Sequence, residues 1–171
     1  MIFIGIDNGL DGAVAVLNDS DNTLKTFSTP FIKEDMGGNK TKRRYDIPGM
    51  INLLKPYANI ATNAFAVLES AQAMPKQGVT SMFSIGYGFG IWSAILACLK
   101  IPHTIIRPQK WQGKYGISGD TKAQAYLVCE RIFPMNKFKT ERGRVLDGHC
   151  DATLMADYAK SYYNNQLEVK T

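Results

Sequence analysis

The chain has 171 residues, the size of one ordinary domain with a substantial core. Hydrophobic residues make up 45% of the chain and charged residues 20%, a balance that excludes a globally disordered protein. The formal net charge of +5 suits a polyanionic partner but is weak evidence alone. Three cysteines without a Cys-x-x-Cys pair argue against a disulfide framework and a zinc knuckle. We therefore expect a reducing, cytoplasmic setting.

The N-terminal third predicts three strands and a loop. Residues Ile2 to Asp7 form an apolar run that predicts a strand buried on both faces and ending in a carboxylate. Gly12–Asn18 and Thr23–Ser28 predict its antiparallel neighbours, joined by a turn-like sequence rich in Asn and Asp. No basic leader precedes the first strand, so we expect no signal peptide. Residues 30–44 are polar and contain two adjacent glycines, and we expect a mobile loop there.

The middle of the chain alternates between helix and strand. Ile47–Tyr57 predicts a helix with a proline near its first turn, and Ala64–Glu69 predicts a strand that again ends in a carboxylate. A loop over residues 74–82 then leads into a long helix that ends near Leu99. Its most apolar part, Phe83–Leu99, is shorter than the roughly 20 residues that span a bilayer. We interpret it as a buried helix and expect no membrane association.

The last third predicts one more strand and two helices. Ile101–Ile106 predicts a short strand, Lys122–Phe133 an amphipathic helix, and Val145–Tyr163 the last helix. A connection rich in Arg, Lys and Trp, with either a loop or a partly helical structure, follows the short strand, and a basic loop follows the amphipathic helix. Three strands followed by alternating helices and strands indicate an α/β fold with a mixed sheet. We expect a single domain over residues 1–163 and a polar C-terminal tail over residues 164–171.

Four carboxylates stand out against this pattern. Asp7 and Glu69 each end a predicted strand whose residues are apolar. Asp147 and Asp151 are four residues apart and so share one helix face with Leu154, which we expect to pack against the sheet. Any one of these acids alone is more usually a turn, cap or solvated residue; the joint pattern favours a site. Carboxylates aimed at one place repel each other and raise their pKa values unless cations compensate. Hard divalent ions such as Mg²⁺ do this, and two of them can promote phosphodiester hydrolysis.

The chain resembles the RuvC family of Holliday junction resolvases, especially its phage-type members, within the RNase H-like superfamily. The resemblance spans nearly the whole chain in the expected order and is carried by the stretches IGIDNGLDGAVAVL, VLESAQAMPKQGVTSMFSIGYGFG, RPQKWQ, TKAQAYLV and DGHCDATLMADYA. It implies an RNase H-like mixed five-stranded sheet flanked by helices. It also implies an intracellular protein of phage or bacterial origin.

The resemblance assigns roles to individual residues. It implies metal-binding, catalytic acids at the four carboxylates Asp7, Glu69, Asp147 and Asp151, with two Mg²⁺ per site and Mn²⁺ as a substitute. It implies a catalytic or phosphate-contacting lysine at Lys122, where a positive charge can neutralise charge that develops on the scissile phosphate. His149 lies between the last two acids; it is either a further metal ligand, as in some relatives, or an ordinary histidine beside the site.

One position departs from the family. Bacterial members carry an aromatic wedge three residues after the strand-end glutamate, and this chain has Gln72 there. Met74 or Phe83 could take over the role of the wedge, although each is more usually a loop or core residue. How the chain would recognise a branch is therefore an open question at this stage.

The basic residues predict a nucleic-acid surface. With the four site acids set aside, 20 basic residues face 11 acidic ones. Candidate phosphate contacts are Lys76, Arg107, Lys110, Lys114, Lys137, Lys139, Arg142 and Arg144, together with the basic cluster at residues 40–44. Such contacts give affinity without sequence readout, and any one of these lysines could equally be solvated surface. The expected partner is branched DNA, especially four-way junctions.

The resemblance also implies a homodimer formed through the long apolar helix, because a twofold dimer presents two sites to two strands of a symmetric junction. The expected function is a Mg²⁺-dependent, structure-selective endonuclease that cleaves Holliday junctions and other branched DNA. Two alternatives stay open. One is a non-catalytic protein that binds branched DNA. The other is an actin-like ATPase-type domain, because GIDNGLDG resembles a phosphate loop, although such proteins need two domains around the nucleotide.

Overall fold

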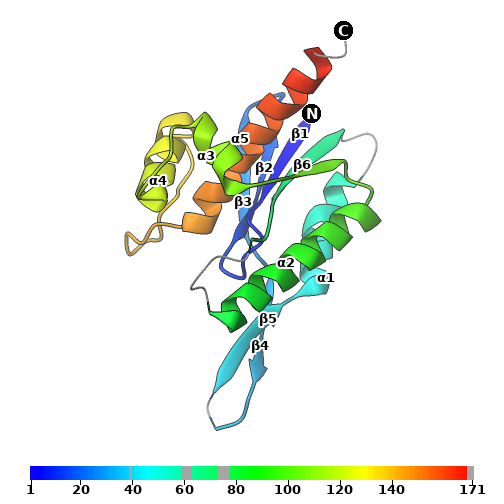
Figure 1. Ribbon diagram of the computed structural model, residues 1–171, viewed down its shortest axis with the longest axis vertical. Helices are drawn as coiled ribbons and strands as arrows, with labels where there is room; N and C mark the ends of the chain where they lie inside the picture. The colour runs from blue at the N-terminus through cyan, green and yellow to red at the C-terminus, as the bar shows by residue number, and fades with distance from the viewer. Residues whose placement is uncertain (39, 59–62, 73–77, 169–171) are drawn as a thin grey trace.

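The computed structural model describes residues 1–38, 40–58, 63–72 and 78–168, and its centre is a five-stranded sheet (Figure 1). The strands are β1 (Ile2–Ile6), β2 (Ala13–Asn18), β3 (Thr23–Ser28), β6 (Ala64–Glu69) and β7 (His103–Ile106). They lie in the order β3-β2-β1-β6-β7. Strand β2 is antiparallel to both of its neighbours, whereas β1, β6 and β7 run parallel. The predicted α/β fold with a mixed five-stranded sheet is confirmed.

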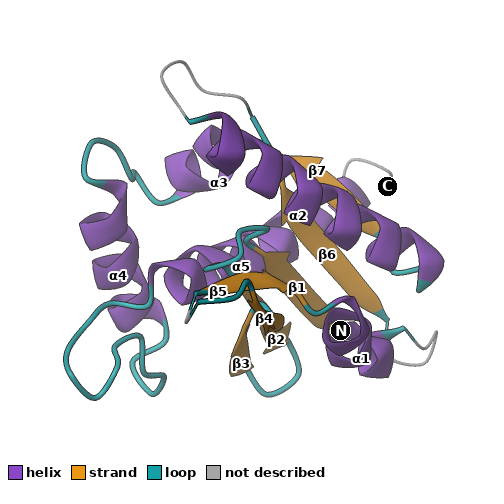
Figure 2. Cartoon of the chain, turned by 90° about the horizontal axis from the view of Figure 1, so that it is seen from below, coloured by secondary structure: helices purple, strands orange, loops and turns teal. Residues whose placement is uncertain are grey.

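Helices cover both faces of this sheet (Figure 2). The helices on one face are α5 (Asp147–Glu168), which crosses the sheet, and α3 (Pro108–Lys114) and α4 (Thr121–Ile132), which pack against α5. The helices on the opposite face are α1 (Ile47–Leu54), continued by the 3₁₀ turn η1 (Lys55–Tyr57), and α2 (Val79–Cys98). The sheet therefore contributes side chains to two separate hydrophobic cores.

The side chains of β1 alternate between these two cores. Phe3 points into the core beneath α5, whereas Ile4 and Ile6 point into the core beneath α1 and α2, and all three are almost fully buried. The strand is buried on both faces, as predicted. Gly5 lies directly under α5, where a Cβ atom would overlap the carbonyl oxygen of Ala152. Only glycine allows the helix to approach the strand this closely.

Residues 30–44 contain two strands, so the predicted mobile loop is wrong. Strands β4 (Phe31–Asp35) and β5 (Thr41–Tyr45) form an antiparallel hairpin that projects from the central sheet (Figure 1). Nearly all of their side chains are exposed, so neither strand shows the apolar alternation from which a strand is recognised. Tyr45 anchors the hairpin at its base: the side chain is buried, and its hydroxyl donates a hydrogen bond to the carbonyl oxygen of Asn8 at 3.2 Å.

Two helices differ from the predicted bounds. Helix α5 ends at Glu168 and not at Tyr163, so residues 164–168 of the predicted polar tail are helical. Helix α2 starts at Val79, within the segment predicted as a loop. Helix ends are the least sharply defined part of a helix, and the sequence pattern alone does not fix them to within a few residues.

Helix α2 is buried on one side only. Ile91, Trp92 and Ile95 pack on the sheet, whereas Val79 and Phe83, nearer its start, are strongly exposed. The predicted buried helix is therefore confirmed for one face. Among the described residues, α2 is the one helix that is long and apolar enough, by length and composition, to cross a membrane.

Candidate active site

The parallel pair β1–β6 places the first two acids side by side. Ile6 pairs with Leu68 in this register, so Asp7 and Glu69 occupy the next position on each strand. The Asn8 side chain strengthens this junction, because its amide nitrogen donates a hydrogen bond to the Glu69 carbonyl oxygen at 2.7 Å. The carboxyl ends of two core strands thus hold two carboxylates at the same edge of the sheet.

The N-terminal turn of α5 brings the other two acids to this edge. Gly148 lies against the loop that follows β1: a Cβ atom there would lie 2.7 Å from the Asp11 carbonyl oxygen and 3.0 Å from Asp7 Oδ2. A side chain at position 148 would push the helix away from the loop. The absence of one allows Asp147 and Asp151, one residue before and three residues after, to reach the vicinity of Asp7.

The acids interact electrostatically, and burial shifts their pKa values upward. The pKa of Asp151 is raised to about 8. Burial is the largest cause, and the charges of Asp7, Glu69 and Asp147 add to it. Burial, followed by the charge of Asp7, raises the pKa of Glu69 to about 7. The pKa of Asp7 is also raised by burial, although a hydrogen bond from the Gly9 N–H at 3.1 Å opposes the shift. The four carboxylates predicted from sequence are therefore close enough to repel each other.

A cluster of this kind fits a divalent metal. Its donors are hard carboxylate oxygens, and a cation would relieve the repulsion that disfavours their charged forms. In the part of the chain that the structure describes, however, no three His, Cys, Asp or Glu side chains are already arranged around one point. Asp7, Asp147 and Asp151 border a shared space and Glu69 lies beside Asp7, so binding an ion would draw their side chains inward.

That space is a cleft of about 1280 Å³. Asp7, Asp147 and Asp151 line it on one side, and Lys122 and Arg144 contribute basic groups to its wall. The side chain of Asp120 caps the N-terminus of α4 by accepting a hydrogen bond from the Ala123 N–H at 3.3 Å, which places Lys122 in the first turn of that helix. The Lys122 ammonium lies 3.1 Å from Asp147 Oδ2, and this contact raises the pKa of the lysine. Acidic and basic groups therefore face the same cleft.

Trp111 is a site residue that the sequence analysis did not single out. Its indole Nε1 donates a hydrogen bond to Glu69 Oε1 at 2.9 Å, and the side chain is only 1% exposed. This bond lowers the pKa of Glu69 against the effect of burial. Since an indole N–H can only donate, Trp111 fixes one carboxylate oxygen as an acceptor. The sequence signal for this residue is the tryptophan in RPQKWQ. The family resemblance includes that stretch but assigns the tryptophan no role.

His149 lines the same cleft, and its ring nitrogens are engaged by β3. Its two ring nitrogens lie 2.9 Å from Thr26 Oγ1 and 3.0 Å from Ser28 Oγ. Burial lowers the pKa of the imidazole. A role of His149 as a metal ligand stays a prediction that would require one of these two hydrogen bonds to break.

Several basic residues predicted to contact DNA are engaged within the protein. Lys114 Nζ lies 2.6 Å from both Asp157 Oδ2 and Ser161 Oγ, and Lys139 Nζ lies 4.2 Å from the centroid of the Tyr126 ring. The geometry at Lys114 therefore favours a structural role that ties α3 to α5. Lys139 can still offer its ammonium to solvent, because the residue is exposed.

The other basic candidates divide into two groups. Five of them are exposed and form no ion pair with another residue that the structure describes: Arg107, Lys110, Lys137, Arg142 and Arg144. The cluster at residues 40–44 lies largely in β5, where Arg43 pairs with Asp11 and Arg44 pairs with Glu34. Two further candidates, Lys76 and Met74, lie outside the described residues. Gln72 and Phe83 are described: Gln72 is half-buried, and Phe83 is exposed on α2.

Comparison with known proteins identifies the fold. No family model and no curated protein sequence matches the chain. Among solved structures, Thermus thermophilus RuvC is similar, with a TM-score of 0.56 at 14% identity over 94% of this chain and 96% of that one. The same protein in complex with a Holliday junction substrate gives a TM-score of 0.51 at 10% identity over 97% and 96%. Fowlpox virus resolvase with its substrate Holliday junction DNA gives 0.49 at 15% identity over 95% and 99%.

These similarities show that the chain has the fold of RuvC. The fold predicted from the sequence resemblance is thereby confirmed. At 10–14% identity the similarity carries the fold alone. The function is argued from the cleft.

Proposed function

We propose that the protein is a divalent-metal-dependent endonuclease that cleaves branched DNA, with Holliday junctions as the preferred substrate. The observation that carries the proposal is the cluster of Asp7, Glu69, Asp147 and Asp151 beside a cleft with basic groups, in which burial and the charges of neighbouring acids raise the pKa values of Glu69 and Asp151. The RuvC-like fold supports it, since one similar structure is RuvC in complex with a Holliday junction substrate. We expect the cleft to receive the scissile phosphodiester.

Each residue of the cluster has a role in this proposal. The four carboxylates would hold Mg²⁺, with Mn²⁺ as a substitute, and two such ions would activate a water and stabilise the leaving oxygen. Lys122, in the first turn of α4, supplies a positive charge near Asp147 that offsets charge developing on the phosphate. Trp111 holds the Glu69 carboxylate in one orientation. Arg144 lines the cleft, and we expect it and the exposed Arg142, two residues before it, to contact the DNA backbone.

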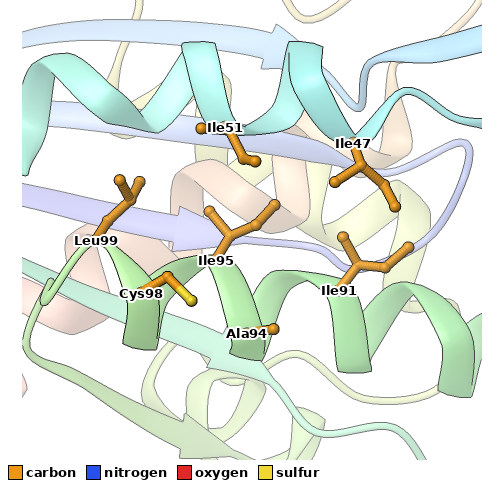
Figure 3. Close-up of a pocket in the computed structure, with 7 residues that line it drawn as sticks. All are labelled: Ile47, Ile51, Ile91, Ala94, Ile95, Cys98 and Leu99. Carbon is orange, nitrogen blue, oxygen red and sulfur yellow. The ribbon is translucent and has the colours of Figure 1, made fainter.

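We also propose that two copies associate through the face formed by α1 and α2. An apolar groove of about 270 Å³ lies between these helices, and Figure 3 shows side chains from both pointing toward it. The groove is lined by Ile47, Ile51, Ile91, Ala94, Ile95, Cys98 and Leu99. Ile47 and Ile51 are more than one-third exposed, so a second copy would remove apolar surface from water. A twofold dimer would present two clefts to the two strands of a symmetric junction.

Cleavage of defined substrates tests the function. Four-way, three-way and linear duplex DNA are incubated with the protein and Mg²⁺, and cuts are mapped on each strand. We expect cuts near the branch of the four-way junction and little cleavage of the linear duplex. A protein that binds the four-way junction but leaves it intact with Mg²⁺ and with Mn²⁺ would instead be a non-catalytic junction binder. Sedimentation at several concentrations tests the dimer separately.

A further inference from the structure

The β4–β5 hairpin has two different faces. In an antiparallel pair, residues directly opposite each other lie on the same face. Phe31 pairs with Tyr45 and Lys33 with Arg43, so these four share one face, which we call the cleft face. The side chains of Phe31 and Arg43 line the cleft that also contains Asp7. The alternate residues, among them Ile32, form the outer face.

Phe31 and Arg43 make a compact unit at the rim of the cleft. The Arg43 guanidinium carbon lies 5.4 Å from the centroid of the Phe31 ring, which remains 40% exposed. The two terminal nitrogens of the same guanidinium donate hydrogen bonds to Asp11 Oδ1 at 2.6 Å and Asp11 Oδ2 at 3.0 Å. A flat apolar surface and a guanidinium therefore stand together on the side of the hairpin that faces the acids.

This pairing of groups matches the chemistry of an unstacked nucleotide. A base offers a flat face for aromatic stacking, and its phosphate accepts a bidentate guanidinium contact. Within a linear duplex both faces of every base are covered by neighbouring bases. At a branch, and in single-stranded DNA, a base can present a free face. A stacking surface at the rim of the cleft would therefore distinguish branched from linear DNA.

We propose that Phe31 and Arg43 form a nucleotide subsite in which Phe31 stacks on a base exposed at the branch and Arg43 binds an adjacent phosphate. The inference rests on the proposed function, since it assigns the branch preference of the same cleft to the hairpin. Asp11 holds the guanidinium in place before DNA binds. Its ion pair with Arg43 is solvent-exposed, with side-chain exposures of 80% for Asp11 and 41% for Arg43. Exposed pairs of this kind are weak, so a phosphate can replace the carboxylate.

The test compares the two faces of one strand. Phe31→Ala and Phe31→Leu remove the ring, and Ile32→Ala, on the outer face, is the matched control because Ile32 is also exposed, at 53%. Fluorescence anisotropy in EDTA measures the affinity of each variant for a four-way junction and for a linear duplex of the same length. We expect both Phe31 variants to lower the junction-to-duplex affinity ratio by about fivefold or more, the contribution of one stacked base. Phe31→Trp should retain the ratio, and Ile32→Ala should leave it unchanged.

Each other outcome has a separate meaning. If the wild type prefers the junction and the Phe31 and Ile32 variants behave alike, the subsite is wrong and the proposed function stands. If the wild type does not prefer the junction, both are overturned. Phe31→Leu keeps an apolar side chain at the base of the hairpin, and a melting curve on each variant identifies any loss that comes from unfolding. Arg43→Ala should weaken junction binding. It should also reduce the slope of log affinity against log salt concentration by about 0.9, the contribution of one phosphate contact.

Discussion

The two walls of the cleft are built in opposite ways. The acidic wall, formed by Asp7 and Asp151 with Glu69 behind them, is carried by the end of β1, by β6 and by α5, the elements of the buried core. The basic wall, formed by Lys122, Arg43 and Arg144, belongs to exposed segments, and Lys122 and Arg43 are held by surface ion pairs. Groups that act on a reacting bond must be preorganised, whereas groups that bind a phosphate backbone need only be near it. The molecule places each kind of group on the kind of support that suits its task.

The electrostatics of the two walls differ accordingly. On the acidic wall, burial raises the pKa of Asp151 to about 8 and that of Glu69 to about 7, so the charged cluster is unstable until a cation enters. On the basic wall, the pairs Arg43–Asp11 and Lys122–Asp147 are exposed, and such pairs stabilise by about 0–1 kcal/mol. A substrate or an ion can therefore change the partners on the basic wall at little cost, while the backbone that carries the acids stays fixed in the core.

The largest expected effect comes from neutralising the acidic wall. Asp7→Asn and Asp151→Asn should each abolish cleavage of four-way junctions while junction affinity stays within a few-fold of wild type, because the DNA contacts lie on the basic wall. Cleavage and gel-shift assays measure the two properties. Asp19→Asn is the matched control, since Asp19 forms an ion pair with Lys160 away from the cleft and should keep full activity. Undiminished metal-dependent cleavage by either site variant would refute the assignment.

The next effect tests how the acidic wall is positioned. Trp111→Phe keeps an aromatic ring in the core but removes the N–H that donates to Glu69, and groups that orient a metal ligand in this way contribute about 10- to 100-fold to activity or metal affinity. We expect a loss of cleavage in that range, together with weaker Mn²⁺ binding by calorimetry. Trp92→Phe is the control, because the Trp92 indole N–H lies in the opposite core and has no hydrogen-bond partner among the described residues. Equal losses in both variants would mean that Trp111 acts only through packing.

The two walls also differ in how far they could be predicted. Asp7 and Glu69 were recognised because each ends a run of buried residues, and the register of parallel strands then brings them together. Trp111 was not recognised as a site residue, because the partner of a buried indole is set by tertiary packing between α3 and β6. The hairpin was missed because exposed strands carry no apolar period. Periodicity detects what faces a core, and the basic wall faces solvent.

The acidic wall should also govern stability as a function of pH in the metal-free protein. The folded pKa values of Glu69 and Asp151 lie above their ordinary values, so folding favours their protonated forms. This contribution is complete below about pH 4 and is lost as the pH rises through about 7 and 8. We expect the melting temperature in EDTA to fall across this window relative to Asp151→Asn, which lacks one of the two groups. Mg²⁺ should reduce the fall, because a bound cation stabilises the charged acids. Identical pH profiles for the two proteins would show that Asp151 ionises normally.

The smallest expected effects separate basic residues that hold the fold from those that would hold DNA. Lys114 is fixed by Asp157 and Ser161, whereas Arg144 is exposed at the cleft. Lys114→Ala should therefore lower the free energy of unfolding by about 1.5–3 kcal/mol, the contribution of a hydrogen bond to a charged group, and leave the salt slope of junction binding unchanged. Arg144→Ala should do the reverse: its melting temperature should match wild type, and the slope of log affinity against log salt should fall by about 0.9. Thermal melts and salt titrations of the two variants make the comparison. A reduced salt slope for Lys114→Ala would place Lys114 on the basic wall, because a lysine held entirely within the protein releases no counterion when DNA binds.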